Sequence, residues 1–149
     1  MNARGFTIGV FQHAADAGRG LEALTRHGFP AEAITILGKD APELRELIQQ
    51  QLSAPPQVFE AAGLGPVAAL GPLIGTLQGD DCRLSTAGLA ATIGRAGFQK
   101  HDGQIYERLA ARGGVLVAVH NLPRAAEALA TLHAYGGGNA AIGAWTGRV

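Results

Sequence analysis

The chain has 149 residues, of which 47% are hydrophobic and 16% are charged, and its formal net charge is +0. This length suffices for one domain with its own core, and we expect a single domain over residues 1–149. Charged residues make up about 25% of an average soluble domain, so the chain is unusually apolar. Without net charge it has no long-range field to attract nucleic acid or an anionic membrane. Its apolar character favours burial of surface against a second copy.

The first residues, MNARGFTIGVF, contain one arginine and a short apolar run. They lack the long apolar region and the small-residue cleavage site of a secretory signal peptide. A single cysteine, Cys82, excludes an internal disulfide framework and favours a reducing compartment. These features predict a cytoplasmic protein.

Residues 5–38 have the pattern of a β-α-β unit. Residues 5–12 (GFTIGVFQ) are apolar on both faces and rich in β-branched and aromatic residues, which predicts a strand. Apolar residues recur at helical spacing over residues 14–27, and Gly28 is placed to end that helix. The run AITIL at residues 33–37 predicts a second strand.

The C-terminal residues 113–147 repeat this pattern. Residues 114–120 (GVLVAVH) predict a strand buried on both faces, Pro123 suits the first turn of a helix, and residues 141–145 (AIGAW) predict a last strand. Shifting the first unit by 108 positions aligns its turn glycines and its apolar helix stripe with those of the second. We therefore predict an internal duplication.

Two β-α-β halves in one sheet predict a ferredoxin-like α+β sandwich. We expect the first strands of the two halves to lie side by side in the centre of the sheet and to run parallel. Both strands are apolar on both faces, whereas the two helices can cover only one face. The other face must then be covered by the central segment or by a second subunit.

Residues 40–112 are predicted to form a helical insertion between the halves. Its stretch 61–79 (AAGLGPVAALGPLIGTLQG) carries no charge, and residues 57–62 are a poor strand. Short polar residues precede three amphipathic segments, as is typical of helix N-termini. The predicted capping residues are Asp40 with Glu43, and Ser85 or Thr86, and Asp102 is expected to begin the last helix.

Several stretches carry motifs of a known family. They are an opening strand ending in V-F, an A…A…L…GF helix, an I-x-(I/V)-L strand, the run G-x-G-P-V-x-A-x-G-P, and a Tyr- and Glu-containing helix leading into R-G-G-V-L-V-x-V. In these motifs the chain resembles the bacterial general stress protein (heat-induced stress protein) family. The resemblance implies a stress-associated, non-enzymatic protein and supplies no catalytic residue. The stretches are residues 8–11, 17–29, 34–37, 63–72 and 106–119.

The uncharged segment 61–79 could lie in a core or subunit interface, touch a membrane surface, or span a membrane. Glycines at four-residue spacing allow close packing in a core or a subunit interface, which we favour. About 20 apolar residues can also span a membrane, but Pro66 and Pro72 interrupt this run and its Ala and Gly residues are weakly apolar. Membrane contact is therefore an alternative that we do not favour. The residues expected at an oligomer interface are Leu64, Val67, Leu70, Gly71, Leu73, Ile74 and Gly75.

Residues 63–68 (GLGPVA) mimic a dinucleotide-binding fingerprint. That motif needs a preceding strand and free backbone N–H groups. Pro66 removes one such donor, and the preceding residues are a poor strand. We predict no nucleotide site.

Four polar residues follow the two predicted central strands: Gln12, His13, His120 and Asn121. In parallel neighbouring strands they would meet at one sheet edge, beside two helix N-termini that favour an anion or polar ligand. Two imidazoles could also begin a metal site, but no third ligand lies near, so we predict no metal and no cofactor. The simpler explanation is that both histidines cap helices or face solvent.

The remaining candidates for chemistry are weak. Cys82 lies beside Asp80, Asp81 and Arg83, whose charges oppose each other, so the sequence predicts an ordinary loop thiol. The spacing of Ser85 from any histidine and aspartate gives no sign of a catalytic triad.

The sequence thus predicts a non-enzymatic, stress-associated protein that forms homo-oligomers through the insertion and the free sheet face. One alternative is a sensor or enzyme of the dimeric αβ-barrel kind with a ligand or metal site at the edge formed by His13 and His120. Another is a peripheral membrane protein that uses residues 61–79.

Overall fold

Five strands form one antiparallel sheet in the computed structural model, which describes residues 5–138. The strand order is β1-β5-β2-β4-β3. The chain therefore has the mixed α+β class that the sequence predicts. The strands are β1 (Phe6–Phe11), β2 (Ile34–Lys39), β3 (Gln57–Ala61), β4 (Gly65–Leu70) and β5 (Val115–His120).

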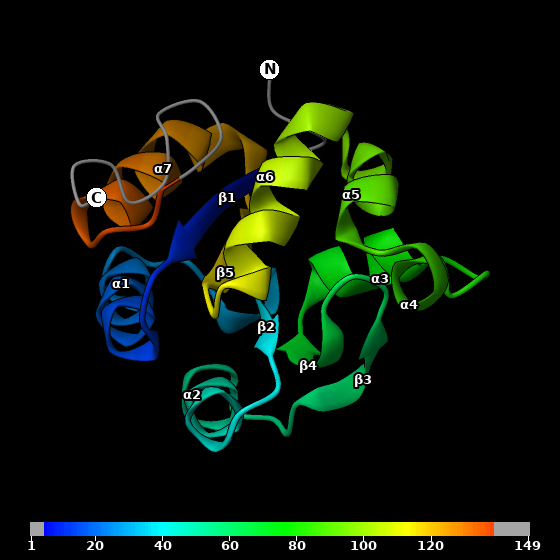
Figure 1. Cartoon of the computed structure of the whole chain (residues 1–149). Helices are drawn as coiled ribbons and strands as arrows, with labels where there is room; N and C mark the ends of the chain where they lie inside the picture. Colours follow the sequence, from blue (N-terminus) through cyan, green and yellow to red (C-terminus); the bar gives the residue numbers. More distant parts are fainter. Residues whose placement is uncertain (1–4, 139–149) are drawn as a thin grey trace.

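Helices cover both faces of the sheet (Figure 1). On one face lie α1 (Ala14–Arg26), α2 (Pro42–Leu52) and α7 (Ala125–Ala134). On the other lie the remaining helices of the predicted insertion, α3 (Pro72–Gln78), α4 (Arg83–Ala87), α5 (Leu89–Thr92) and α6 (Lys100–Ala111). Short 3₁₀ turns connect these elements: η2 (Ala31–Ala33), η3 (Ile93–Ala96) and η4 (Leu122–Arg124).

The doubly apolar strands are buried by the chain itself. Ile8 and Val10 of β1 pack in the cluster under the insertion helices, and Val117 and Val119 of β5 pack in the opposite cluster. The sequence left open whether the central segment or a second subunit covers the second face. The central segment covers it, so the predicted free sheet face is not free.

The first β-α-β unit forms where the sequence predicts it. The apolar stripe of α1, which includes Leu21 and Leu24, is buried. The chain turns after the helix at Gly28, whose φ of 87° is left-handed and suits glycine. The turn delivers the chain to β2.

Strands β1 and β5 are neighbours, as predicted, but they run antiparallel, so the predicted parallel pairing is wrong. The crossover through α1 returns the chain to β2, which lies two places from β1 in the sheet. β5 fills the place between them and pairs antiparallel with both, Phe6 facing His120 and Ile34 facing Val119. β1 is thus an outer strand of the described sheet, with one bridge from Val10 to Gly138. The predicted strand at 141–145 lies outside the described residues.

The segment predicted as a helical insertion is not purely helical. Residues 57–61, expected to be a poor strand, form β3 and pair with β4 in a hairpin. Its turn contains Gly63 and Gly65, with φ of 84° and 78°, which glycine adopts without strain. Pairing with a neighbouring strand outweighs the low intrinsic preference of this stretch. The uncharged segment therefore contributes a strand and only then the short helix α3.

The predicted helix caps are also corrected. Ala41 precedes α2, and no side chain caps that helix, because Asp40 accepts hydrogen bonds from Arg45 Nε and Nη2 at 2.6 Å each. Ser85 lies inside α4, where its backbone N–H and hydroxyl both bond to Gln78. The helix expected to begin at Asp102 begins at Lys100.

Candidate functional site

The predicted histidine edge does not form. In the antiparallel register Phe6 faces His120 and Phe11 faces Val115. Gln12 and His13 therefore leave one end of the β1–β5 pair, and His120 and Asn121 leave the other. Five residue steps at about 3.4 Å each separate the two ends by roughly 17 Å. A ligand or metal site shared by His13 and His120 is excluded by this distance.

His120 and Asn121 close the end of β5. The imidazole of His120 stacks on the ring of Phe6, with centroids 4.5 Å apart and planes inclined by 22°. The backbone N–H of Asn121 donates to the Gly5 carbonyl at 3.0 Å. His120 is exposed on its other side. These contacts extend the β1–β5 ladder and explain both residues structurally.

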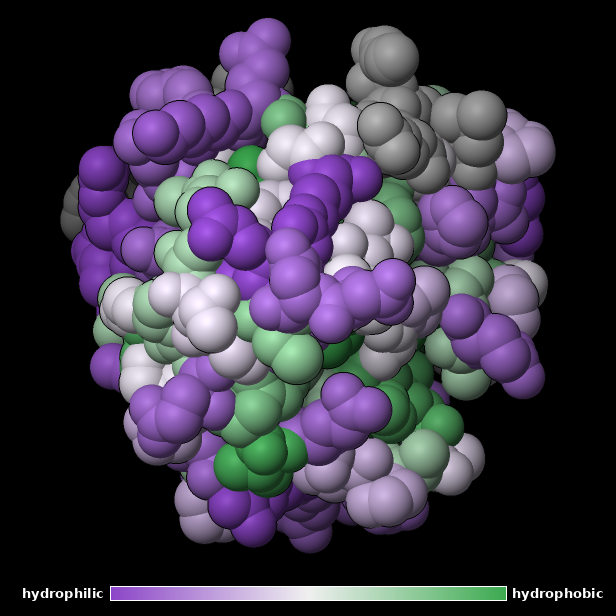
Figure 2. Space-filling model, turned by 90° about the vertical axis from the view of Figure 1, so that its right-hand side faces the viewer, coloured by the Kyte–Doolittle hydropathy of each residue, from purple (hydrophilic) through white to green (hydrophobic). Residues whose placement is uncertain are grey.

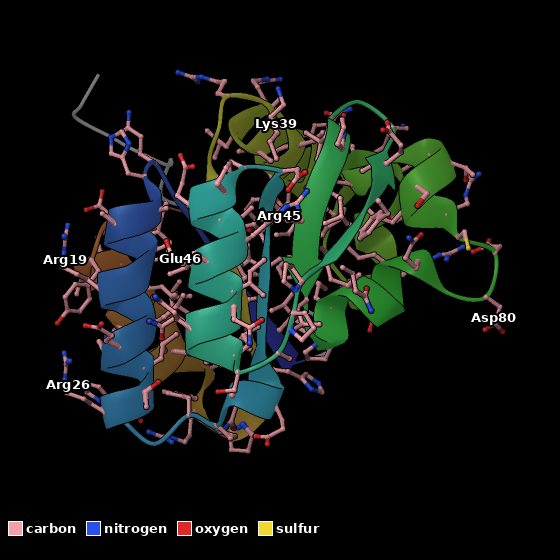
Figure 3. All side chains as sticks on the ribbon, turned by 90° about the horizontal axis from the view of Figure 1, so that it is seen from below. Arg19, Arg26, Lys39, Arg45, Glu46 and Asp80 are labelled. Atoms are coloured by element: carbon pink, nitrogen blue, oxygen red, sulfur yellow. The ribbon has the colours of Figure 1, made fainter. Side chains whose placement is uncertain are left out.

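Gln12 and His13 line a cavity of about 170 Å³ at the other end of the sheet. Lys39, Glu43 and the backbone of Gly113 and Gly114 line it as well. The ends of β1 and β2, the start of β5 and the N-termini of α1 and α2 meet there. Figure 3 shows α1 and α2 side by side, with Lys39 at the end of the molecule where α2 begins.

The electrostatics of this cavity are mixed. Neither His13 before α1 nor Ala41 before α2 caps its helix with a side chain, and helix N-termini attract negative charge. Lys39 Nζ, however, already donates to the Ala111 carbonyl at 3.2 Å, and Glu43 adds a negative charge. The cavity thus has room for a small polar molecule, but its charged side chains do not favour one kind of ligand, because Lys39 is already hydrogen-bonded and Glu43 opposes an anion.

The predicted interface residues divide into buried and accessible ones. Leu64, Val67, Leu73 and Ile74 are at most 4% exposed, because they pack in the chain's own core. Leu70 and Gly71 are half-buried and line a shallow groove of about 200 Å³ together with Leu52 and Pro72. Gly75 is exposed. Only the accessible residues can meet a second copy without unfolding this one.

Accessible apolar residues line part of that groove and continue onto the neighbouring strand β3, and we call them the β3 patch. Val58 is 47% exposed, the largest value among the large hydrophobic side chains of the described residues. It faces Ala68 across the hairpin, and Ala68 packs in the cluster of the α2 side, so Val58 lies on that face of the sheet. The side of the molecule that carries β3 shows green and white residues between groups of purple ones (Figure 2). We define the patch as the half-buried groove residues Leu52, Leu70 and Pro72, together with the exposed Val58 of β3 and the half-buried Pro56 just before that strand.

Sequence reasoning missed Val58, because it treated residues 57–62 as a poor strand. The polar residues Gln57 and Glu60 flank two adjacent apolar residues, Val58 and Phe59, so this short stretch lacks the alternation that would reveal a half-buried strand. The flanking signals were the Pro55-Pro56 break and the glycines of the hairpin turn.

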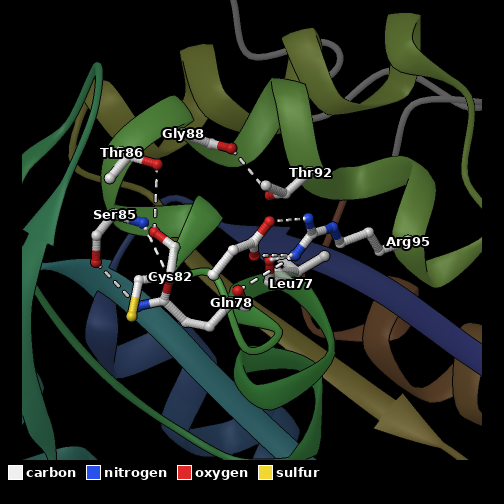
Figure 4. Close-up of polar contacts among 9 residues, drawn as sticks. Leu77, Gln78, Cys82, Ser85, Thr86, Gly88, Thr92 and Arg95 are labelled. Atoms are coloured by element: carbon white, nitrogen blue, oxygen red, sulfur yellow. Dashed lines mark hydrogen bonds and ion pairs between the residues drawn. The ribbon is translucent and has the colours of Figure 1, made fainter.

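A polar network fixes the loop after α3 (Figure 4). The Arg95 guanidinium donates to both carboxylate oxygens of Asp81, at 2.9 and 2.8 Å, and to the carbonyls of Leu77 and Gln78 at 3.2 Å each. The hydrogen bonds from Arg95 lower the pKa of Asp81 to about 2. Ser85 takes part through Gln78, so it has a structural role, and the exposed Cys82 lies in the loop.

Comparison with known proteins finds no matching family model, curated protein or solved structure. None of the helices in residues 5–138 combines the length and the apolar character needed to span a bilayer. Within the same residues no three His, Cys, Asp or Glu side chains gather where they could hold a metal ion. The resemblance to general stress proteins stays a prediction.

Proposed function

We propose that the protein is a non-enzymatic, stress-associated protein that self-associates through its insertion. The observation that carries the self-association is the β3 patch, an apolar surface left accessible at the outer end of the sheet. Residues Val58 and Leu70 contribute to it from both strands of the hairpin. The stress association rests on the sequence resemblance alone.

A second copy is the partner that best fits the β3 patch. The formal net charge is +0, so two copies approach without long-range repulsion. The five residues of the patch carry no charge, and burying apolar surface stabilises an interface by about 25 cal/mol per Å². Neutral molecules with an exposed apolar patch tend to associate.

Light scattering over a dilution series, without detergent, tests this proposal. We expect a discrete oligomer that dissociates on dilution. Val58→Ser removes an apolar side chain from the patch and is expected to weaken association about tenfold, which corresponds to about 1.4 kcal/mol.

The matched control is Leu129→Ser. Leu129 is the other exposed large hydrophobic residue of the described chain, at 37%, and it lies on α7, away from β3. We expect this variant to associate like the natural protein. A monomer at every concentration contradicts the proposal, and so does an equal effect of both substitutions.

We further propose that residues 5–38 and 113–147 form a duplicated ferredoxin-like core into which residues 40–112 are inserted. In a ferredoxin-like sheet the third strand lies between the first two, and the order β1-β5-β2 supports this arrangement. The bridge from Val10 to Gly138 supports it too, because it lies on the side of β1 where such a core has its fourth strand.

A further inference from the structure

We propose that two copies of the chain join edge to edge through β3, antiparallel, about a two-fold axis at Phe59. This inference rests on the proposed self-association and specifies the surface and the register. This pairing would join the five-stranded sheets of the two copies into one continuous sheet.

β3 is the last strand of the sheet, so its outer side has no ladder partner among the described residues. Backbone groups of alternate residues in an antiparallel strand point to opposite sides. The Ala61 carbonyl accepts the Leu64 N–H of the hairpin turn at 2.9 Å, so Ala61 and Phe59 direct their backbone toward β4. Val58 and Glu60 are left with outward-facing N–H and C=O groups.

Both ends of this edge are bounded. Before β3, Pro55 and Pro56 have no N–H to donate. After it, the N–H of Ala62 donates to the Ser85 carbonyl at 3.1 Å and is unavailable to another chain. A pairing strand therefore has only the five residues of β3 to use.

Charge and donor placement select one register among those that pair outward-facing residues. With Phe59 on the axis, Val58 of each copy faces Glu60 of the other, and no like charges oppose each other. Moving the axis from Phe59 to Glu60 places Glu60 of one copy against Glu60 of the other, and opposed like charges destabilise a strand pair. Moving the axis to Val58 places Glu60 against Pro56, which has no backbone N–H to donate.

This register also joins the two apolar surfaces. Antiparallel pairing about an axis perpendicular to the sheet keeps the same face on both copies, so the α2 sides become continuous. Val58, 47% exposed in one chain, then lies beside the second chain, and the two β3 patches meet. A single edge pair of this length is weak, and the joined patches supply the additional burial.

Charge substitutions at Val58 test the register. Val58→Glu and Val58→Lys remove the same apolar side chain and introduce side chains of similar length. In the proposed register Val58→Glu opposes Glu60 twice by symmetry, whereas Val58→Lys gains an opposite-charge pair twice. We expect the dimer dissociation constant from sedimentation velocity to rise about tenfold or more for Val58→Glu and threefold or less for Val58→Lys.

The double variant Val58→Glu with Glu60→Lys restores opposite charges across the pair and is expected to recover most of the loss. Circular dichroism and thermal melting check that each variant is folded, which the exposure of both side chains favours. A natural protein that stays monomeric overturns both this inference and the proposed self-association. A natural dimer that Val58→Glu and Val58→Lys weaken equally, or not at all, overturns the edge pairing and leaves self-association standing.

Discussion

Gly71 and Gly75 share the four-residue glycine spacing of the uncharged segment, yet their surroundings are opposite. Gly71 has a φ of 129°, and a Cβ added to it would lie 2.5 Å from the Ile34 carbonyl oxygen and from Thr35. It lets the start of α3 approach β2 closely, where the hydroxyl of Thr35 accepts the Leu73 N–H at 2.9 Å. Gly75 is exposed within α3, and a Cβ there would meet nothing within 4 Å.

The two alanine substitutions are therefore expected to change stability in opposite directions. In Gly71→Ala the alanine has to adopt a positive φ, and its Cβ collides with the backbone of Ile34 and Thr35. We expect this to lower the free energy of unfolding by about 3 kcal/mol. Gly75→Ala is expected to stabilise by up to about 1 kcal/mol, because alanine is the better helix former. Urea denaturation of both variants measures this. A neutral Gly71→Ala variant would contradict the close approach of α3 to β2.

The ion pair between Asp81 and Arg95 is expected to make an acid-sensitive contribution to stability. The pKa of Asp81 is lowered to about 2 in the folded chain, from 3.8 for a free side chain, chiefly by the hydrogen bonds from Arg95. A lowered folded pKa means that the contribution is complete above the unfolded pKa and is lost as pH falls through the folded one. The melting temperature of the natural protein should then approach that of Asp81→Asn between about pH 4 and pH 2. A constant difference over this range would contradict the role of the pair.

At the scale of elements, local sequence patterns predict β1, α1, β2 and β5, because each strand is a continuous apolar run bounded by turn residues and α1 has an apolar stripe at helical spacing. Gly28 marks the end of α1 in the sequence and turns the chain in the structure. These elements can be predicted without knowing which distant segments pack against them. They make up most of the two predicted β-α-β halves.

The errors lie where the partner decides the outcome. β3 exists because β4 pairs with it, and no window of five residues contains that information. β5 lies between β1 and β2 and runs antiparallel to both, and the strand sequences alone specify neither its place nor its direction. That single direction moves His120 away from His13, so the predicted site failed although its four residues follow the strands as expected. Asp40 has capping spacing, but Arg45 captures its carboxylate instead.

At the scale of the whole molecule, the predicted insertion (residues 40–112) is part of the core. One apolar cluster joins β1, β4 and β5 to α3 and α6, and the other joins the same sheet to α1, α2 and α7. The sheet separates two clusters that share every central strand. Removing support from either face exposes strands on which the other face depends, so both should unfold together.

Matched core truncations on the two faces test this coupling. Leu77 of α3 and Leu24 of α1 are both fully buried, on opposite faces. Replacing either with alanine is expected to cost about 3 kcal/mol, through lost burial and the cavity left behind. Both variants should keep a single thermal transition by circular dichroism and calorimetry, at a similarly lowered melting temperature. If the insertion were an accessory, Leu77→Ala would instead melt in two steps and leave the main transition in place, because β1, β2 and β5 would hold together without α3.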